Sequence, residues 1–218
     1  MTPRAIVFDA YGTLFDVRAV VLQQARQIDA DVDTLARLWR QRQLEYTWLL
    51  SLMGHYEDFW SVTHSALHSS CRQLRIELSA GGRDALLKSY LSAPLFPEVT
   101  SALEGLKRFT LAILSNGSPD MLAAAVRNSG LDSTMAEVIS VDRVKVYKPS
   151  PRAYALGVET LRLPPKDMLF VSSNWWDVWG AKTFGYSVCW CNRSGEAIEC
   201  APDLVVTSLD QIAGRLTG

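Results

Sequence analysis

Short apolar runs, each followed by polar or turn-forming residues, recur along the chain. They cover Ile6–Phe8, Leu111–Leu114, Val138–Ser140, Met168–Val171, Val188–Trp190 and Leu204–Val206. Continuous apolar runs of this length are typical of strands that are buried on both faces. From residue 97 onward helical stretches separate them, one opened by Pro119 with Ser118 as its cap and another running from Pro151 to about Leu161. This alternation predicts an α/β fold with a doubly wound parallel, Rossmann-like sheet and right-handed crossovers.

The chain between the first two predicted strands follows a different, helical pattern. Asp33 is the expected N-cap of a long helix that runs to about Met53, where Gly54 offers a stop. Further helices are expected around residues 56–73 and 82–92. The predicted architecture is an α/β core of residues 1–14 and 97–218 with an inserted helical cap of residues 15–96. Leu-rich and Trp-rich faces on this insertion exceed what it needs alone, so we expect a homodimer contact through the cap.

Composition and charge narrow the class of function. A net charge of −1 over 218 residues gives no electrostatic case for binding nucleic acid or an anionic membrane. The apolar runs are too short to span a bilayer, and the first residues lack the apolar segment of a signal peptide. We therefore expect a cytoplasmic protein. The cysteines show no zinc spacing and no Cys-x-x-Cys pair; they are Cys71, Cys189, Cys191 and Cys200.

Polar side chains follow three of the predicted strands at the point where each strand ends. Asp9 follows the first strand, Ser115 and Asn116 follow the second, and the segment 172–177 follows the fourth. Because ligands of open α/β sheets bind just beyond the carboxyl ends of the strands, these residues are expected to form one site. Lys148, in a loop that can reach the same edge, would hold two neighbouring carboxylates ionised. Asp9 alone could be a turn residue, but the coincidence of these groups favours catalysis.

The same motifs resemble a known family. They comprise Asp9-x-Tyr11-Gly12-Thr13-Leu14, Ser115-Asn116-Gly117, Lys148-Pro149 and Ser172-x-Asn174-x-x-Asp177. The pattern resembles the haloacid dehalogenase superfamily, and more narrowly the L-2-haloacid dehalogenases. The resemblance covers essentially the whole chain, including the segment 38–46 around Arg40, which lies on a partly apolar face of the predicted long helix.

Most members of this superfamily are magnesium-dependent phosphatases, so a phosphatase of a small phosphorylated metabolite is the alternative function. The phosphatase pattern carries a second aspartate two residues after the nucleophile, where this chain has Tyr11. The fourth motif supplies only one acid, Asp177, and Lys148 nearby makes a poor site for a hard cation. We therefore expect no metal and no cofactor. A binding module that merely keeps the fold would have no need of Asp9, Arg40 and Lys148 together.

The resemblance implies hydrolysis of short (S)-2-haloacids to (R)-2-hydroxy acids and halide. Asp9 would attack C2 of the substrate, and water would then hydrolyse the aspartyl ester. The residues implied in the chemical steps are Asp9, Thr13, Arg40, Lys148, Ser172, Asn174 and Asp177. Those implied in substrate binding are Tyr11, Arg40, Ser115, Asn116, Tyr154 and Trp176.

Individual roles also follow from the resemblance. The groups implied in holding the departing halide are Arg40, Asn116 and Trp176. The groups implied in holding the substrate carboxylate are the hydroxyl of Ser115 and backbone N–H groups near Tyr11 and Asn116. Asp177 is the expected base for the hydrolytic water, positioned by Asn174 and Ser172. Thr13 is expected to orient Asp9.

The remaining aromatic and imidazole side chains carry three further expectations. The resemblance implies that Tyr154 closes the pocket near Lys148. A tight pocket for two- or three-carbon acids is expected from the crowding of Trp175, Trp176 and Trp179. The histidines are at positions 55, 64 and 68. His64 and His68 could share a helix face as metal ligands do, but no third ligand is evident, so a solvated helix face is favoured for them. A Gly-x-Ser-x-Gly elbow and a glycine-rich dinucleotide fingerprint are both absent from the sequence.

Overall fold

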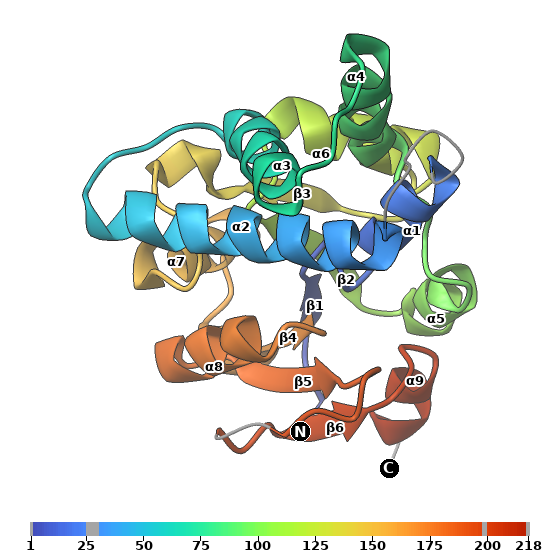
Figure 1. Cartoon of the computed structure of the whole chain (residues 1–218). Coiled ribbons are helices and arrows are strands. Elements are labelled where there is room, and N and C mark those ends of the chain that lie inside the picture. The colour runs from blue at the N-terminus through green and yellow to red at the C-terminus, as the bar shows by residue number, and fades with distance from the viewer. Residues whose placement is uncertain (1, 25–30, 198–199, 217–218) are drawn as a thin grey trace.

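The computed structural model describes residues 2–24, 31–197 and 200–216. Within these ranges the chain forms a six-stranded sheet in the order β3-β2-β1-β4-β5-β6, with every neighbouring pair parallel (Figure 1). The strands are β1 (Ala5–Phe8), β2 (Thr110–Ser115), β3 (Glu137–Ser140), β4 (Met168–Ser172), β5 (Ser187–Cys191) and β6 (Leu204–Val206). The predicted strands and the doubly wound, Rossmann-like order are confirmed.

Helices connect these strands as the alternation predicts. They are α5 (Val99–Leu106), α6 (Pro119–Asn128), α7 (Pro151–Leu161), α8 (Trp175–Phe184) and α9 (Gln211–Arg215), with short 3-10 turns η2 (Tyr90–Ser92), η3 (Val141–Val144) and η4 (Pro165–Asp167). Pro119 and Pro151 open α6 and α7, because the fixed φ of proline suits a first helical position. Ser118 occupies the N-cap of α6, although its side chain makes no capping hydrogen bond. In the described ranges, no helix has both the length and the apolarity to cross a membrane.

Four further helices lie between β1 and β2 in chain order: α1 (Val17–Gln23), α2 (Val32–Leu52), α3 (Phe59–Leu74) and α4 (Ala80–Ser89). The long helix was expected, but the predicted N-cap was wrong by two residues. Asp31, not Asp33, accepts hydrogen bonds from the N–H groups of Asp33 and Thr34. Asp31 has the extended backbone that an N-cap requires, whereas Asp33 lies inside the first turn and pairs with Arg18 of α1.

The chain leaves and re-enters the sheet region at one place. Phe15 and Leu95 form an antiparallel bridge, and on either side of it Asp16 N donates to Pro94 O and Phe96 N donates to Leu14 O. The segment between these ends carries α1 to α4, and Figure 1 shows the long helix α2 running across the molecule with α3 beside it. We call residues 15–96 the helical insertion; its boundaries as a separate cap unit stay a prediction.

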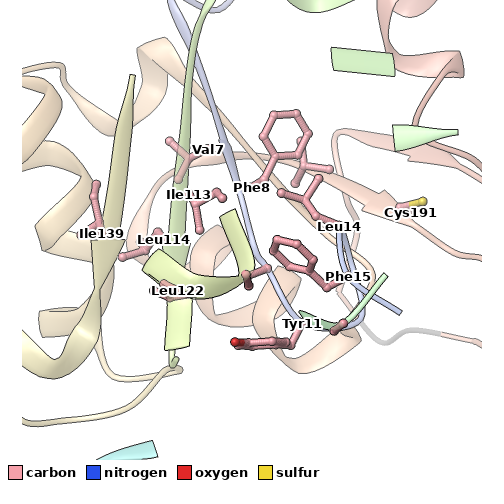
Figure 2. Packing of buried hydrophobic residues seen from close by; sticks show 14 of the residues in the cluster. Val7, Phe8, Tyr11, Leu14, Phe15, Ile113, Leu114, Leu122, Ile139 and Cys191 are labelled. Atoms are coloured by element: carbon pink, nitrogen blue, oxygen red, sulfur yellow. The ribbon is translucent and has the colours of Figure 1, made fainter. Parts of the chain in front are cut away.

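Strand β1 is the most enclosed part of the sheet. All four of its residues are fully buried, and Phe8 pairs with Ile113 on one side and Val171 on the other. Figure 2 shows Val7, Phe8, Leu14 and Phe15 within this packing. Full burial of a side chain of this size contributes about 1.5–3 kcal/mol, so the backbone is firmly held where it leaves the sheet at Asp9.

Candidate active site

Asp9 lies at the carboxyl end of the central strand and is held from several directions. Its backbone N–H donates to Val171 O at 2.9 Å, and the residue is only 5% exposed. Thr13 Oγ1 donates to Asp9 Oδ2 at 3.1 Å, and Asn174 Nδ2 donates to the same oxygen at 2.8 Å. Thr13 is itself fixed, because its Oγ1 accepts from Ser173 N at 2.9 Å. The carboxylate therefore has a defined orientation before any ligand arrives.

Lys148 bridges Asp9 and Asp177, as the sequence predicts. Its Nζ lies 3.0 Å from Asp9 Oδ1 and 2.9 Å from Asp177 Oδ2, and the side chain has no exposed area. Burial alone would lower the pKa of Lys148, but the charges of Asp177 and Asp9 outweigh burial, so the pKa is raised. The group is consequently an ammonium ion throughout the physiological range.

Asp177 is completely buried on the first turns of α8. Tyr154 Oη donates to Asp177 Oδ1 at 2.8 Å, so both oxygens of this carboxyl group are engaged. Burial raises the pKa of Asp177 to about 6; Lys148 opposes the rise and the charge of Asp9 adds to it. Asp177 is therefore ionised above about pH 6. A general base is most effective when its pKa lies close to the working pH, and this value satisfies that condition.

Tyr154 does not occupy the expected position at the mouth of a pocket. It is fully buried between α7 and the sheet, where its ring meets Phe170 edge-on at 5.7 Å. Its hydroxyl donates to Asp177, and its backbone oxygen accepts from Tyr186 Oη at 3.0 Å. The residue faces inward because α7 packs this side against the sheet. Tyr154 therefore holds Asp177 in position.

The turn after β4 is built by its own side chains. Ser172 Oγ accepts from Asn174 N at 3.1 Å, and Ser172 is fully buried. This bond places Asn174 at the N-cap of α8, from which its amide reaches Asp9. The glycine opposite, Gly12, has φ +92°, and a Cβ there would stand 3.7 Å from the Asn174 amide. The positive φ of Gly12 allows the tight turn that follows Asp9.

Ser115 and Asn116 line the neighbouring strand end. Ser115 Oγ accepts from Gly117 N at 3.1 Å, and its own proton remains available to a further acceptor. Asn116 Oδ1 accepts from Lys148 N at 3.0 Å, which fixes the orientation of the amide. The Nδ2 group of Asn116 is therefore the end that can donate to a ligand.

The helical insertion reaches this site through α2. Arg40 Nη2 donates to Tyr11 O at 3.1 Å, and Tyr11 O also accepts from Asn174 Nδ2 at 3.5 Å. Two turns further along α2, Trp48 meets Trp176 edge-on, with ring centroids 5.7 Å apart. Arg40, Asn116 and Trp176 are hence placed around the Asp9 end of the sheet. Trp48 was missed as a site residue, although its spacing of eight residues from Arg40 puts both on one helix face.

The predicted crowding by three tryptophans holds for Trp176 alone. Trp176 is 8% exposed, whereas Trp175 and Trp179 are 42% and 43% exposed. The latter two are four residues apart on the outer face of α8, and their rings lie 6.4 Å from each other. They line a surface groove of about 610 Å³, together with Trp48, Trp176, Pro149 and Pro151 among others. Trp175 and Trp179 therefore line an open groove at the surface and do not enclose a tight pocket.

The donor set around Asp9 does not suit a divalent cation. Across the described residues, no three His, Cys, Asp or Glu side chains are grouped in a way that could hold a metal ion. The place between the two site carboxylates, where a hard cation would be expected, is taken by the Lys148 ammonium. His64 and His68 lie on an exposed face of α3, away from this cluster.

A parallel sheet that places an aspartate after its first strand, beside a threonine, a lysine and a second aspartate, defines a class of hydrolase. Residues 3–185 match the family model of the haloacid dehalogenase-like hydrolases, and the chain belongs to this family.

Known relatives are similar over nearly the whole chain. Haloacetate dehalogenase H-2 of Moraxella sp. (strain B) is 45% identical, over 95% of this chain and 95% of its own length. The (S)-2-haloacid dehalogenase of Pseudomonas sp. (strain YL) is 46% identical, over 94% and 91% respectively. The solved structure of L-2-haloacid dehalogenase from Xanthobacter autotrophicus with chloropropionic acid covalently bound superposes with a TM-score of 0.91, at 40% identity and 99% coverage of both chains.

Proposed function

We propose that the protein is an (S)-2-haloacid dehalogenase that converts short (S)-2-haloacids to (R)-2-hydroxy acids and halide. The observation that carries the proposal is the Lys148 ammonium between Asp9 and Asp177, with Tyr11 where a phosphatase would carry its second aspartate. A leaving halide needs no general acid, so the reaction does not require that aspartate. The names of the relatives support the same substrate class.

In the first step an Asp9 oxygen attacks C2 of the substrate from the side opposite the halogen. The bond between this oxygen and C2 forms, and the carbon–halogen bond breaks with its electron pair leaving on the halide. Configuration at C2 is inverted. Thr13, Asn174 and Lys148 hold the carboxylate in one orientation, which lowers the entropic part of the barrier. The covalently bound chloropropionic acid in the Xanthobacter structure supports such an ester.

In the second step water attacks the ester carbonyl of Asp9. The acyl–oxygen bond breaks, the leaving alkoxide takes a proton back from Asp177 and departs as the 2-hydroxy acid, and the carboxylate of Asp9 is restored as the remaining proton of the water passes to solvent. We assign the proton of the attacking water to Asp177. Because alkylation neutralises Asp9, Lys148 is left with Asp177 as its remaining anionic partner, and this keeps Asp177 ionised for the hydrolytic step.

Substrate binding is assigned to both parts of the chain. Arg40 on α2, Asn116 after β2 and Trp176 on α8 would surround the halogen. The hydroxyl of Ser115 and the backbone N–H groups near Tyr11 would hold the carboxylate, where oriented donors in a dry site are strongest. Trp176 is the one tryptophan of α8 that would limit the size of the substituent on C2.

A single-turnover reaction in heavy-oxygen water tests the chemical route. With excess enzyme and (S)-2-chloropropionate, the ester mechanism incorporates the label into the Asp9 carboxylate, and the first product molecule carries none. Label that appears in the product of the first turnover, with none in Asp9, would contradict the mechanism. Release of chloride in the presence of EDTA tests the metal-free chemistry, and restoration of a lost activity by magnesium would favour the phosphatase-like alternative.

Substitution Asp9→Asn separates an enzyme from a binding module. Halide release is expected to fall by at least about 10⁴-fold because an amide oxygen is a poor nucleophile. Circular dichroism should stay unchanged, since Thr13 can still donate to the amide oxygen. Thr110→Ser, at the opposite end of β2, is a matched conservative control. Halide release by the Asp9 variant at the wild-type rate would rule out Asp9 as the nucleophile.

We also propose a homodimer through the helical insertion and a cytoplasmic location. Support for the dimer comes from the end of α2, where Leu49, Leu52 and Met53 are 52%, 85% and 67% exposed. Light scattering after size exclusion tests the dimer, and a monomer at all concentrations up to about 100 μM would refute it.

Support for the cytoplasmic location comes from the free thiols of Cys71, Cys189, Cys191 and Cys200, which suit a reducing compartment. Cell fractionation tests this second proposal.

A further inference from the structure

The phenol of Tyr11 is a buried polar group for which the mechanism above has no use. Tyr11 is 2% exposed, and its hydroxyl has no hydrogen-bond partner among the residues that the structure describes. Buried polar groups in native proteins are nearly always paired, because an unpaired one is destabilising. Fold stability alone would therefore favour phenylalanine at this position. The hydroxyl calls for a functional explanation.

The ring of Tyr11 is held firmly. Phe59 of α3 stacks on it at 6.1 Å with an interplanar angle of 20°, and the rings of Phe15 and Tyr90 lie 5.9 Å away. These contacts come from both the helical insertion and the core. These rings fix the direction of the hydroxyl, and none of them forms a hydrogen bond with it.

The ring of Tyr11 lies beside Gly117, the neighbour of Asn116, and within range of the Arg40 charge. A Cβ at Gly117, the residue after Asn116, would stand 2.9 Å from Tyr11 Cε2, the ring carbon next to the one that carries the hydroxyl. Arg40 binds the backbone oxygen of Tyr11, and its charge acts on the phenol as well. Figure 2 shows the hydroxyl pointing away from Phe15.

The phenol stays protonated at any working pH. Burial raises the pKa of Tyr11 far above its ordinary value, the neighbouring Tyr90 adds to the rise, and Arg40 opposes it only in part. A neutral phenol offers one O–H donor in a site where an anion is released.

We propose that the Tyr11 hydroxyl donates a hydrogen bond to the halogen as it leaves, beside Arg40 and Asn116. The inference rests on the proposed dehalogenase function. A halogen bound to carbon is a poor hydrogen-bond acceptor and a free halide is a good one. The bond therefore strengthens as the carbon–halogen bond breaks, and it stabilises the transition state more than the bound substrate. No electron or proton is transferred to or from Tyr11 in this role.

Substitution Tyr11→Phe tests the role with three substrates that differ only in the halogen. Single-turnover release of halide from (S)-2-chloro-, bromo- and iodopropionate measures the displacement step alone. The rate should fall by about 10- to 100-fold for chloride, which is the range for one lost donor to a developing anion. The loss should be smaller for bromide and smallest for iodide, because acceptor strength falls in that order.

Tyr90→Phe is the matched control. Tyr90 lies against Tyr11, but its hydroxyl already donates to Gln43 Oε1 at 3.0 Å. Its loss should affect the three substrates equally. An equal loss for all halogens in Tyr11→Phe would overturn the proposal and assign the hydroxyl to the substrate carboxylate or to packing.

The outcomes separate the two layers of inference. A wild-type enzyme that releases halide, with no halogen order in the variant, refutes the role of Tyr11 alone. A wild-type enzyme that releases no halide refutes the function and this role with it. If Tyr11→Phe does not fold, a crystal of the wild type soaked in bromide gives the second measurement. Anomalous scattering should place bromide within hydrogen-bond distance of Tyr11 Oη, and bromide bound elsewhere in the site would refute the proposal.

Discussion

Removal of Lys148 is the most direct test of the electrostatics of the site. The ammonium is fully buried and lies 3.0 Å and 2.9 Å from oxygens of Asp9 and Asp177. Lys148→Met keeps most of the side-chain length and its contact with the Phe170 ring, over which Nζ lies at 5.0 Å, but removes the charge. The remaining carboxylates would then be buried without their counter-ion.

The magnitude follows from the burial of both partners. Deleting one partner of a buried ion pair destabilises a protein by about 3–5 kcal/mol, because the other charge is left unpaired. Asp177 can relieve this by binding a proton. Its pKa is already raised by burial to about 6, and it rises further without Lys148. We therefore expect a loss of about 3–5 kcal/mol at pH 8 and a clearly smaller loss at pH 5, where Asp177 is protonated in both proteins.

The contribution of Asp177 to stability decreases as the pH rises. An acid whose folded-state pKa exceeds its unfolded value of 3.8 binds more protons when folded, so its contribution to the unfolding free energy falls as pH rises. In the wild type this fall is complete above about pH 6, with a size of about 3 kcal/mol for a shift of about two units. In the variant the fall extends to higher pH.

Urea unfolding followed by circular dichroism at pH 5 and pH 8 measures both quantities. Lys182→Met is the control, because Lys182 pairs with Asp203 at the surface, where the two side chains are 37% and 43% exposed. Its loss should stay below about 1 kcal/mol at either pH. A loss for Lys148→Met that matches this control, or that does not depend on pH, would refute the reasoning.

Two further predictions concern the base. Asp177 acts on the ester, in which the neutral Asp9 no longer raises its pKa, so the kcat–pH profile should lose activity on the acid side at an apparent pKa below about 6. A profile without any acid limb would contradict Asp177 as base. Gly180→Ala should lower kcat by about 10- to 100-fold. The added Cβ would stand 2.5 Å from Tyr154 Oη and 2.7 Å from Pro149 Cβ, so it would displace the tyrosine that holds Asp177. Steady-state kinetics against Gly81→Ala, whose Cβ meets no atom within 4 Å, measures the effect, and equal kcat values would contradict it.

The strands and the gathering of polar residues were predictable because both depend on local pattern. Strands buried on both faces need uninterrupted apolar runs, such as Ile6–Phe8, whichever helices cover them. In a parallel sheet the carboxyl ends of neighbouring strands meet at one edge. Asp9, Asn116 and Asp177 could thus be assigned to one site without knowledge of any contact.

Side-chain direction on helices was harder to predict. Trp175, Trp176 and Trp179 are within two turns of α8, yet only Trp176 faces inward. Their spacing does not say which face the helix turns toward the sheet, because the helix is apolar on both sides. Tyr154 was misplaced for the same reason, since its position depends on how α7 packs on β4.

The N-cap of α2 shows a second limit. Asp31 and Asp33 are equally good capping residues, and only the backbone conformation distinguishes them. Roles that depend on a ligand form a third limit. Tyr11 belongs to the first motif, but the motif does not show that its hydroxyl is unpaired, because this depends on packing.

The paired crossing at Leu14–Asp16 and Pro94–Phe96 has a consequence for how this enzyme can change. Asp9 follows a strand of the sheet, whereas Arg40 lies in the helical insertion. The two ends of that insertion lie side by side at this crossing. Insertions, deletions and repacking between the crossings can alter which leaving groups are recognised without disturbing the register of β1. Exchange of residues 15–96 between relatives would therefore vary the part of the site that Arg40 supplies, while Asp9, Lys148 and Asp177 stay in place.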